Sequence, residues 1–260
     1  MHNETANAVL LNCEPPIAVI TLNRPNDYNA FNADLRSGLL VALRTLEGRR
    51  DIRVVIIAGN GPAFCAGQDL KEAFPPSVYT RVHAEVEPVL MGLRRLDKVV
   101  IAAVHGVTAG IGIGLIAAAD LALMADNTYV TLAFSKIGLI PDGGVTWELL
   151  RGLGYKRAFR LMIESGKLTP LECQECGLVN ELVPANEIME RALTWAQQLS
   201  ETSPIANVLT KRVLHQVADL TLAGAIAYET VLQERAAASA DCAEGVRAFL
   251  EKRPPCFPGF

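Results

Sequence analysis

The sequence has few cysteines and no long apolar run. Its six cysteines are scattered through 260 residues, too sparsely for a disulfide framework of the kind found in small secreted proteins. Residues 1–12 lack the basic start and the apolar core of a secretory signal. No apolar run approaches the roughly 18 to 20 residues that a membrane span needs. We therefore expect a cytoplasmic protein that does not cross a membrane.

An excess of basic residues is also missing. The chain has 24 Lys and Arg against 28 Asp and Glu, and its pI of 5.7 argues against a general nucleic-acid binder. A ligand that carries phosphate remains possible, because a few local cations suffice to bind one. Cys173 and Cys176 form a lone CxxC without a second ligand pair nearby, so packing in a helical core is favoured over a metal site.

Half of the residues are apolar, which suits a soluble globular protein with one sizeable core. Short apolar runs at 8–13 and 17–22 predict a pair of strands. Asn32 is placed to cap a helix with leucines on one face, and residues 53–58 read as a buried strand. The order is strand, strand, helix, strand.

The pattern predicts that the same unit recurs further along the chain. Residues 98–104 predict a buried strand, which a glycine-rich turn joins to a helix ending near Ala119. Strands follow at 121–125 and 129–134, and another helix begins at Pro141. The pattern predicts an α/β fold in which strand-strand-helix units form the turns of a spiral.

From about Asn186 the apolar spacing is only helical, and it is divided among four segments: 188–199, 204–217, 222–238 and 243–251. We expect a spiral core over residues 1–200 and a helical region over 201–260. The apolar faces of that region fit either the chain's own core or another subunit.

Two glycine-rich turns each offer a backbone amide. In "FCAGQDL" at 64–70, Gly67 allows a left-handed turn that would aim the Gln68 N–H into a cleft, although a plain strand-to-helix turn explains it equally well. In "HGVTAGIGIG" at 105–114, the Ile111 amide begins a helix and is a natural donor to a developing negative charge. A dinucleotide loop is disfavoured there, because Leu115 occupies the third small-residue position.

Asp142 stands between Pro141 and the pair Gly143-Gly144 in "KIGLIPDGGVTW". The local pattern alone favours a helix N-cap, which is a common use of aspartate. The alternative is the acid/base group of an active site. His83 and His105 have no nucleophile or ligand cluster beside them, so surface or core roles are expected for both.

Six blocks in order resemble the crotonase superfamily of enoyl-CoA hydratases and isomerases over nearly the whole chain. They are "LNRPNDYNAFN", "FCAGQDL", "VIAAVHGVTAGIGIGL", "AFSKIGLIPDGG", "GLVNELVP" and "EGVRAFLEKRPPCFPG". The resemblance implies a spiral closed by C-terminal helices that form homotrimers or dimers of trimers. It also implies an acyl-CoA substrate, with coenzyme A entering as part of that substrate, and neither a further cofactor nor a metal.

By the same resemblance, the amides of Gln68 and Ile111 hold the thioester oxygen. The position of Ile111 is more often glycine or alanine in the family. A variable segment, residues 73–89 here, forms a wall of the acyl pocket, and Phe249 and Lys252 reach the nucleotide of a neighbouring subunit. The full set that the resemblance assigns to substrate binding is Arg24, Ala30, Ala66, Gly67, Gln68, Asp69, Leu70, Gly110, Phe134, Phe249 and Lys252.

Two departures from the family pattern indicate the reaction. Hydratases of the family carry two glutamates at the positions of Gly114 and Phe134, and neither residue here can move a proton. Branches with "GLxPD" carry their working aspartate at the position of Asp142, and the chain is especially similar to the 1,2-epoxyphenylacetyl-CoA isomerases. This comparison favours a catalytic role for Asp142. If Leu139, Ile140 and Phe134 form apolar walls around its carboxyl, they would raise its pKa.

The expected activity is migration of a double bond, or rearrangement of a ring, in an unsaturated or epoxidised acyl-CoA. A hydratase, or another reaction of the superfamily such as thioester hydrolysis, is the alternative. A protein that binds acyl-CoA without turning it over is a third and less favoured interpretation.

Overall fold

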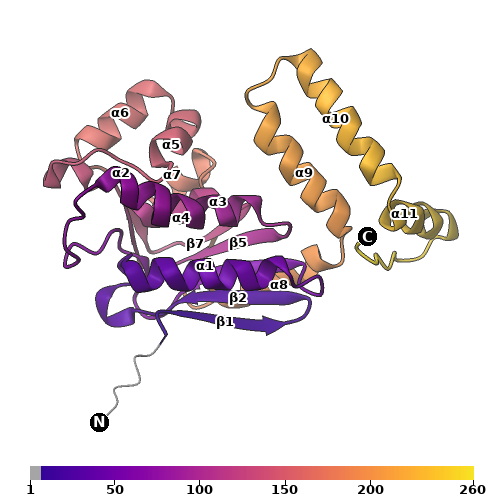
Figure 1. Ribbon diagram of the computed structural model, residues 1–260, viewed down its shortest axis with the longest axis horizontal. Helices are drawn as coiled ribbons and strands as arrows, with labels where there is room; N and C mark the ends of the chain where they lie inside the picture. Colours follow the sequence, from indigo (N-terminus) through magenta and orange to yellow (C-terminus); the bar gives the residue numbers. More distant parts are fainter. Residues whose placement is uncertain (1–6) are drawn as a thin grey trace, which may run out of the picture.

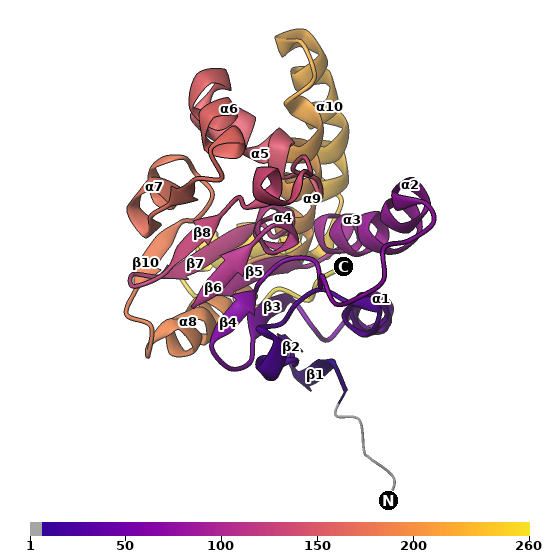
Figure 2. The ribbon, with the colours of Figure 1, turned by 90° about the vertical axis from the view of Figure 1, so that its left-hand side faces the viewer.

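The computed structural model describes residues 7–260, and its strands form two sheets (Figures 1 and 2). The six-stranded sheet has the order β1-β2-β3-β5-β7-β10, and the four-stranded sheet has the order β4-β6-β8-β9. The first consists of β1 (Val9–Glu14), β2 (Ile17–Leu22), β3 (Val54–Gly59), β5 (Val99–Val104), β7 (Leu121–Ala125) and β10 (Glu181–Val183). The second consists of β4 (Ala63–Cys65), β6 (Val107–Ala109), β8 (Tyr129–Thr131) and β9 (Lys167–Leu168).

The helices that matter for the site lie between these strands in the chain. They are α1 (Ala33–Glu47), α2 (Val78–Arg81), α3 (Glu87–Arg95), α4 (Ile111–Ala118), α5 (Val145–Leu153), α6 (Tyr155–Ile163) and α7 (Pro170–Glu175). The C-terminal helices are α8 (Ile188–Ser200), α9 (Pro204–Val217), α10 (Leu222–Ala237) and α11 (Ala240–Glu251). None of the helices within residues 7–260 is both long and apolar enough to cross a membrane.

Each pass of the chain adds one strand to each sheet. The successive pairs β3 and β4, β5 and β6, and β7 and β8 divide between the two sheets in this way, and β2, β3, β5, β7 and β10 are parallel neighbours. This is the spiral of strand-strand-helix units that the sequence predicts. The carboxyl ends of β4, β6 and β8 therefore lie at one edge, where the loops that follow them meet.

Alternating side chains of the central strands enter two separate cores. Val55 and Ile57 of β3 belong to the cluster that contains the buried face of α1, whereas Val54 and Ile56 belong to the cluster that contains α8. Because both faces are covered, β3 is a continuous apolar run without polar alternation. Figure 2 shows α8 on one side of the strands and α3 and α4 on the other.

Helix α9 stands against this body through a buried ion pair. The Lys211 ammonium lies 2.8 Å from the Asp120 carboxylate and also donates to the Lys98 carbonyl oxygen at 3.1 Å. The ammonium also donates to the carbonyl oxygen of Leu93 in α3 at 3.4 Å, so these contacts hold α9 against the body, and α10 then returns beside α9 (Figure 1).

The local expectations are partly confirmed. The Asn32 side chain accepts from the Leu35 N–H at 3.0 Å and caps α1 as predicted. The expected strand at 129–134 ends at Thr131, and Phe134 instead begins a 3-10 turn (Phe134–Ile137). Helix α11 begins three residues earlier than expected, because Ser239 caps it by accepting from the Cys242 N–H. Cys173 is the buried residue of α7 and packs in the core, as the packing interpretation predicts.

The prediction that Asp142 caps a helix is wrong. Helix α5 begins at Val145, and its N-cap is Gly144 without any side-chain cap. Gly143 and Gly144 have φ values of 62° and 80°, so two successive left-handed residues turn the chain before the helix starts. Only the Asp142 carbonyl takes part in the turn, by accepting from the Val145 N–H at 3.2 Å. The carboxylate is therefore left free of any capping role.

We expect Asn29→Ala to lower the free energy of unfolding by about 2–4 kcal/mol. Asn29 is fully buried with φ 53°, and its amide group accepts from the Arg24 N–H and donates to the carbonyls of Asn60 and Ala63. Alanine leaves these buried groups unpaired and disfavours the left-handed backbone. Urea unfolding measures the change, and Asn60→Ala, which removes an exposed side chain, is the matched control. Equal stability of the two variants would contradict this account.

Candidate active site

The site begins where two glycine turns touch. Gly67 follows β4 with φ 98°, and Gly110 follows β6 with φ 51°. A Cβ on Gly67 would lie 3.2 Å from the Ala109 oxygen and 3.7 Å from the Gly110 Cα. Glycine allows this approach and the positive φ, and the approach brings together the two turns that carry the amides of Gln68 and Ile111, one residue further along each.

Neither of these two amides has an acceptor within residues 7–260. The Phe31 N–H donates to the Gly67 oxygen and the Asp69 N–H donates to the Phe31 oxygen, so the intervening Gln68 N–H points away from Phe31. Ile111 is the first residue of α4, where an N–H has no partner inside the helix. Two adjacent free donors, one with the positive end of a helix dipole behind it, suit an oxygen that becomes negative.

Asp142 is brought to this pair through its neighbour. A Cβ on Gly143 would lie 2.4 Å from Ile111 Cδ1 and 3.6 Å from Leu90 Cδ1, so the turn after Asp142 packs on the first turn of α4. The Phe134 ring lies 3.6 Å from the Cβ position of Gly110. The structure thus gathers the three stretches that the sequence analysis singled out.

The Asp142 side chain is exposed at the surface, but the protein atoms around its carboxyl partly desolvate it and raise its pKa above the usual value, while a hydrogen bond from its own backbone opposes the rise. No other side chain or backbone group in the described part of the chain bonds this carboxylate. The expected walls are only partly present, because Ile140 is 82% exposed and Leu139 is 42% exposed. The apolar groups nearest this turn are instead Leu90 and Ile111, which contact Gly143.

Gly114 has a second consequence besides the loss of a glutamate. A Cβ at this position would lie 2.5 Å from the Gly143 carbonyl oxygen, closer than real contacts allow. The turn that carries Asp142 therefore occupies the space that a side chain at 114 would need. A glutamate at position 114 is therefore incompatible with the observed position of the Asp142 turn.

We expect Gly114→Ala to lower turnover by about tenfold or more, because the Asp142 turn must shift, and a misplacement near 1 Å costs up to about 100-fold. Steady-state kinetics with an enoyl-CoA measures the loss. Gly48→Ala is the matched control, since the nearest atom lies 4.0 Å from its Cβ position. Unchanged turnover in Gly114→Ala would contradict this account, because it would show that the Asp142 turn can shift without loss of activity.

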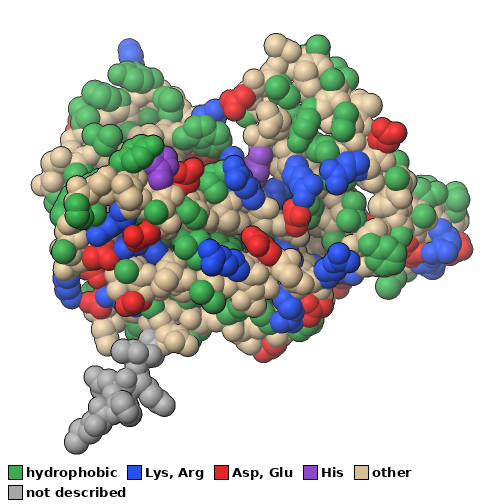
Figure 3. All heavy atoms as spheres, in the orientation of Figure 1, with side chains coloured by type: hydrophobic (Ala, Val, Ile, Leu, Met, Phe, Trp, Pro, Cys, Tyr) green, Lys and Arg blue, Asp and Glu red, His purple; other side chains and the backbone are tan. Residues whose placement is uncertain are grey.

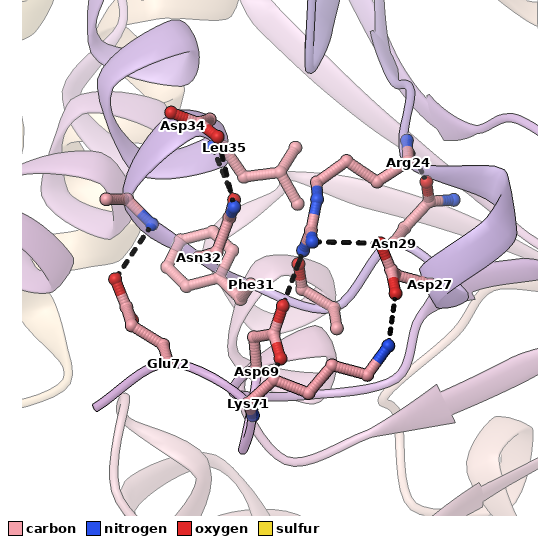
Figure 4. Close-up of polar contacts among 12 residues, drawn as sticks. Arg24, Asp27, Asn29, Phe31, Asn32, Asp34, Leu35, Asp69, Lys71 and Glu72 are labelled. Carbon is pink, nitrogen blue, oxygen red and sulfur yellow. Dashed lines mark hydrogen bonds and ion pairs between the residues drawn. The ribbon is translucent and has the colours of Figure 1, made fainter. Parts of the chain in front are cut away.

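The residues expected to line the coenzyme A channel lie together in two segments, 24–31 and 66–71, that are fastened to each other (Figure 4). The Arg24 guanidinium lies 2.9 Å from both Asp27 and Asp69 and also donates to the Ala30 carbonyl. The backbone bond from Ala66 to Tyr28 adds to the fastening. Arg24 therefore links the two segments, and the Asp27 and Asp69 carboxylates balance its charge.

Lys71 is a cation of these segments that the sequence analysis missed. Its ammonium lies 2.7 Å from Asp27, and its side chain is 82% exposed. Phe249 and Lys252 lie elsewhere, at the end of α11, and Phe249 is 82% exposed. Figure 1 places α11 at the opposite end of the long axis from α2. Their expected contact with a neighbouring subunit remains a prediction.

A cavity of about 480 Å³ opens beside the Asp142 turn. Its lining combines small and apolar residues with four charged or ionisable ones: Val82, Val86, Glu87, Leu90, Met91, Arg94, Gly114, Ala117, Ala118, Gly143, Gly144, Trp147, Glu148 and His215. Figure 3 shows the molecule hollowed between α5 and α9, with cationic and histidine side chains at the floor of the hollow. Of the segment 73–89 that was expected to form a wall, only the part from Val82 onward lines this cavity, and the lining continues to Arg94.

The sequence analysis did not name the cavity residues Arg94, Trp147, Glu148 and His215 as site residues. They come from α3, α5 and α9, which are far apart in the chain, and no local motif joins them. In the described part of the chain, no three His, Cys, Asp or Glu side chains are arranged to hold a metal ion.

Residues 13–259 match the family model described as "Enoyl-CoA hydratase/isomerase". A Rhodobacter capsulatus protein named "Probable enoyl-CoA hydratase" is 38% identical over 94% of this chain and 95% of its own length. The "1,2-epoxyphenylacetyl-CoA isomerase" of Escherichia coli is 34% identical over 96% of this chain and 98% of its own length. The chain is therefore not especially similar to that isomerase, contrary to the expectation from the sequence, because other relatives match it about equally well.

The solved structures agree with the fold. The crystal structure of an enoyl-CoA hydratase from Bacillus anthracis superposes with a TM-score of 0.92 at 29% identity, covering 97% of this chain and 100% of that one. An enoyl-CoA hydratase structure from Geobacillus kaustophilus also reaches 0.92, at 31% identity over 98% of both chains.

Proposed function

The chain belongs to the enoyl-CoA hydratase/isomerase family, and from that membership we propose that it moves a double bond in an unsaturated acyl-CoA with Asp142 as the acid/base group. One observation carries the proposal. The turn that carries Asp142 packs on Ile111, the first residue of α4, while the two positions where hydratases carry glutamates hold Gly114 and Phe134.

The proposed reaction needs only these parts. The thioester oxygen accepts from the Gln68 and Ile111 amides, and Asp142 removes a proton from the α- or γ-carbon of the acyl group. The electron pair moves onto the thioester oxygen as an enolate, and the proton returns from Asp142 to the other carbon. Each well-placed amide stabilises such an enolate by about 3 to 4 kcal/mol.

Coenzyme A enters this reaction only as part of the substrate, and we propose that segments 24–31 and 66–71 hold it. The ion pairs of Arg24 support this role by fixing the two segments relative to each other, and Lys71 supplies an exposed ammonium for a phosphate. The same carboxylate and amides suit the opening of an epoxide ring or the rearrangement of a cyclic acyl group.

We expect the rate to fall at acidic pH with a midpoint above the usual aspartate pKa. The base acts only as carboxylate, and partial desolvation raises the pKa of Asp142, so protonation inactivates it at a higher pH than it would a fully solvated aspartate. A pH profile of kcat/KM measures this midpoint. Circular dichroism at the lowest pH serves as the folding control, and a midpoint at or below the ordinary value would oppose the assignment.

Hydration is the alternative, and the names of several relatives favour it, including the R. capsulatus protein and the B. anthracis structure. Asp142 would then act on water. Incubation with a 3-enoyl-CoA and with a 2-enoyl-CoA separates the two reactions, because migration changes the conjugated absorbance at constant mass, whereas hydration adds one water to the product. Binding of both without turnover would indicate a non-catalytic acyl-CoA protein.

We also propose that the protein forms homotrimers or dimers of trimers through its C-terminal helices. Large apolar side chains remain exposed on α10 and α11, namely Leu222, Ile226, Val231, Val246, Phe249 and Leu250. Exposed apolar side chains gathered on two neighbouring helices are typical of a surface that another subunit covers. Sedimentation equilibrium tests the assembly, and a monomer at micromolar concentration would contradict it.

A further inference from the structure

The cavity beside Asp142 is the natural place for the acyl group. Its near end is formed by Gly114, Gly143 and Gly144, and Gly143 packs on Ile111, whose amide faces the thioester oxygen in the proposed function. An acyl chain held there has Asp142 at its reacting carbons and extends along the apolar wall of α3 and α4. This step rests on the proposed function.

Arg94 lines the cavity from the last turn of α3, and its only partner within residues 7–260 is an aromatic ring. The side chain is half-buried and forms no hydrogen bond or ion pair with any residue from 7 to 260. Its guanidinium carbon lies 5.0 Å from the centre of the Trp147 ring. The N–H donors of this guanidinium are therefore available to a ligand that enters the cavity.

Glu148 lines the same cavity from the first turn of α5 and is also unpaired in the described part of the chain. It does not form an ion pair with Arg94, although Arg94 is close enough to counteract the burial that raises the pKa of Glu148. The Arg94 guanidinium can only donate hydrogen bonds, and the Glu148 carboxylate can only accept them. The two groups line the same cavity from two different helices, α3 and α5.

The other ionisable groups around this space are already matched or neutral. Glu87 bonds His83, and Arg151 lies 3.5 Å from Asp219 and over the Trp147 ring. Burial, with Arg94 and Lys211, lowers the pKa of His215 to about 4, so this histidine is neutral at physiological pH. The free pair that a ligand meets is Arg94 and Glu148.

We propose that this cavity selects acyl groups that carry a hydroxyl group on the part distant from the thioester, with the hydroxyl bridging Arg94 and Glu148. A hydroxyl oxygen accepts from the guanidinium and its proton is donated to the carboxylate, so one group satisfies both. A plain alkyl end leaves both charges unpaired. A carboxylate end suits Arg94 but is repelled by Glu148 and Glu87.

The test measures binding of saturated acyl-CoA thioesters, which do not react, by isothermal titration calorimetry. Three series of equal chain lengths end in a hydroxyl, a methyl or a carboxylate group. At the length that reaches the pair, the unsubstituted protein should bind the hydroxyl ligand about 10- to 100-fold more tightly than the methyl ligand, the range expected for hydrogen bonds to charged groups. Arg94→Met and Glu148→Gln should each reduce that ratio to about threefold or less.

Met91→Leu is the matched control, because it changes the same cavity without changing its charge. Its ratio should equal that of the unsubstituted protein, and thermal unfolding verifies that each variant is folded. Preference for the methyl or carboxylate series, or an unchanged ratio in both charge variants, would overturn the proposal. The measurement needs no turnover, so it can be interpreted even if the protein proves not to be an isomerase. Asp142→Asn should not alter the ratio of hydroxyl to methyl ligand affinity.

Discussion

Asp142→Asn is expected to lower the rate of double-bond migration by about 10²- to 10⁴-fold, the usual contribution of a general base. The amide has the shape of the carboxylate but cannot take a proton. The Asp142 carboxylate has no bonding partner other than its own backbone, so the substitution breaks no side-chain contact within residues 7–260. The loss should therefore appear in kcat, with affinity for acyl-CoA nearly unchanged.

Exchange of the α-proton with deuterated solvent gives a second measurement of the same step. It should disappear in Asp142→Asn together with migration, because both require removal of a carbon-bound proton. Asp126→Asn, at an exposed position, is the matched control and should retain full activity. Wild-type exchange in Asp142→Asn would assign the base to another group.

Ile111→Pro is expected to lower kcat by about 10²- to 10³-fold by removing one of the two amide donors. Proline is accepted at the first position of a helix, and Ile111 is the first residue of α4 after the cap Gly110. The substitution thus deletes a hydrogen-bond donor while the helix can remain.

Ile111 is also a buried side chain, so the loss of packing must be measured separately. Ile111→Ala removes the same contacts with Gly143 but retains the N–H, and the comparison of the two variants isolates the amide. Gln68→Ala should change kcat little, because only its backbone amide is assigned a role. Equal kcat in Ile111→Pro and Ile111→Ala would remove Ile111 from the oxyanion site.

Much of the fold could be predicted because the signals are local. The buried strands are short apolar runs, Asn32 is an ordinary cap, and Gly67 and Gly110 stand where left-handed backbone is needed. The error at Asp142 has an equally local cause. The cap rule treats the residue before a helix as extended, whereas Gly143 and Gly144 are both left-handed and move the start of α5 to Val145.

The sequence by itself determined the spiral of strand-strand-helix units and pointed to the two glycine turns, because each depends on residue types close together in the chain, whereas the proposal for Asp142 came from the family resemblance. Only the tertiary structure decided what surrounds them. It showed that the Asp142 turn fills the space that a side chain at position 114 would need, and that Arg24 links two segments by ion pairs. It also showed that Arg94 and Glu148 line the same cavity. These contacts join α3, α4, α5 and the β4 and β6 loops, and they exist only after the sheets have stacked the turns of the spiral.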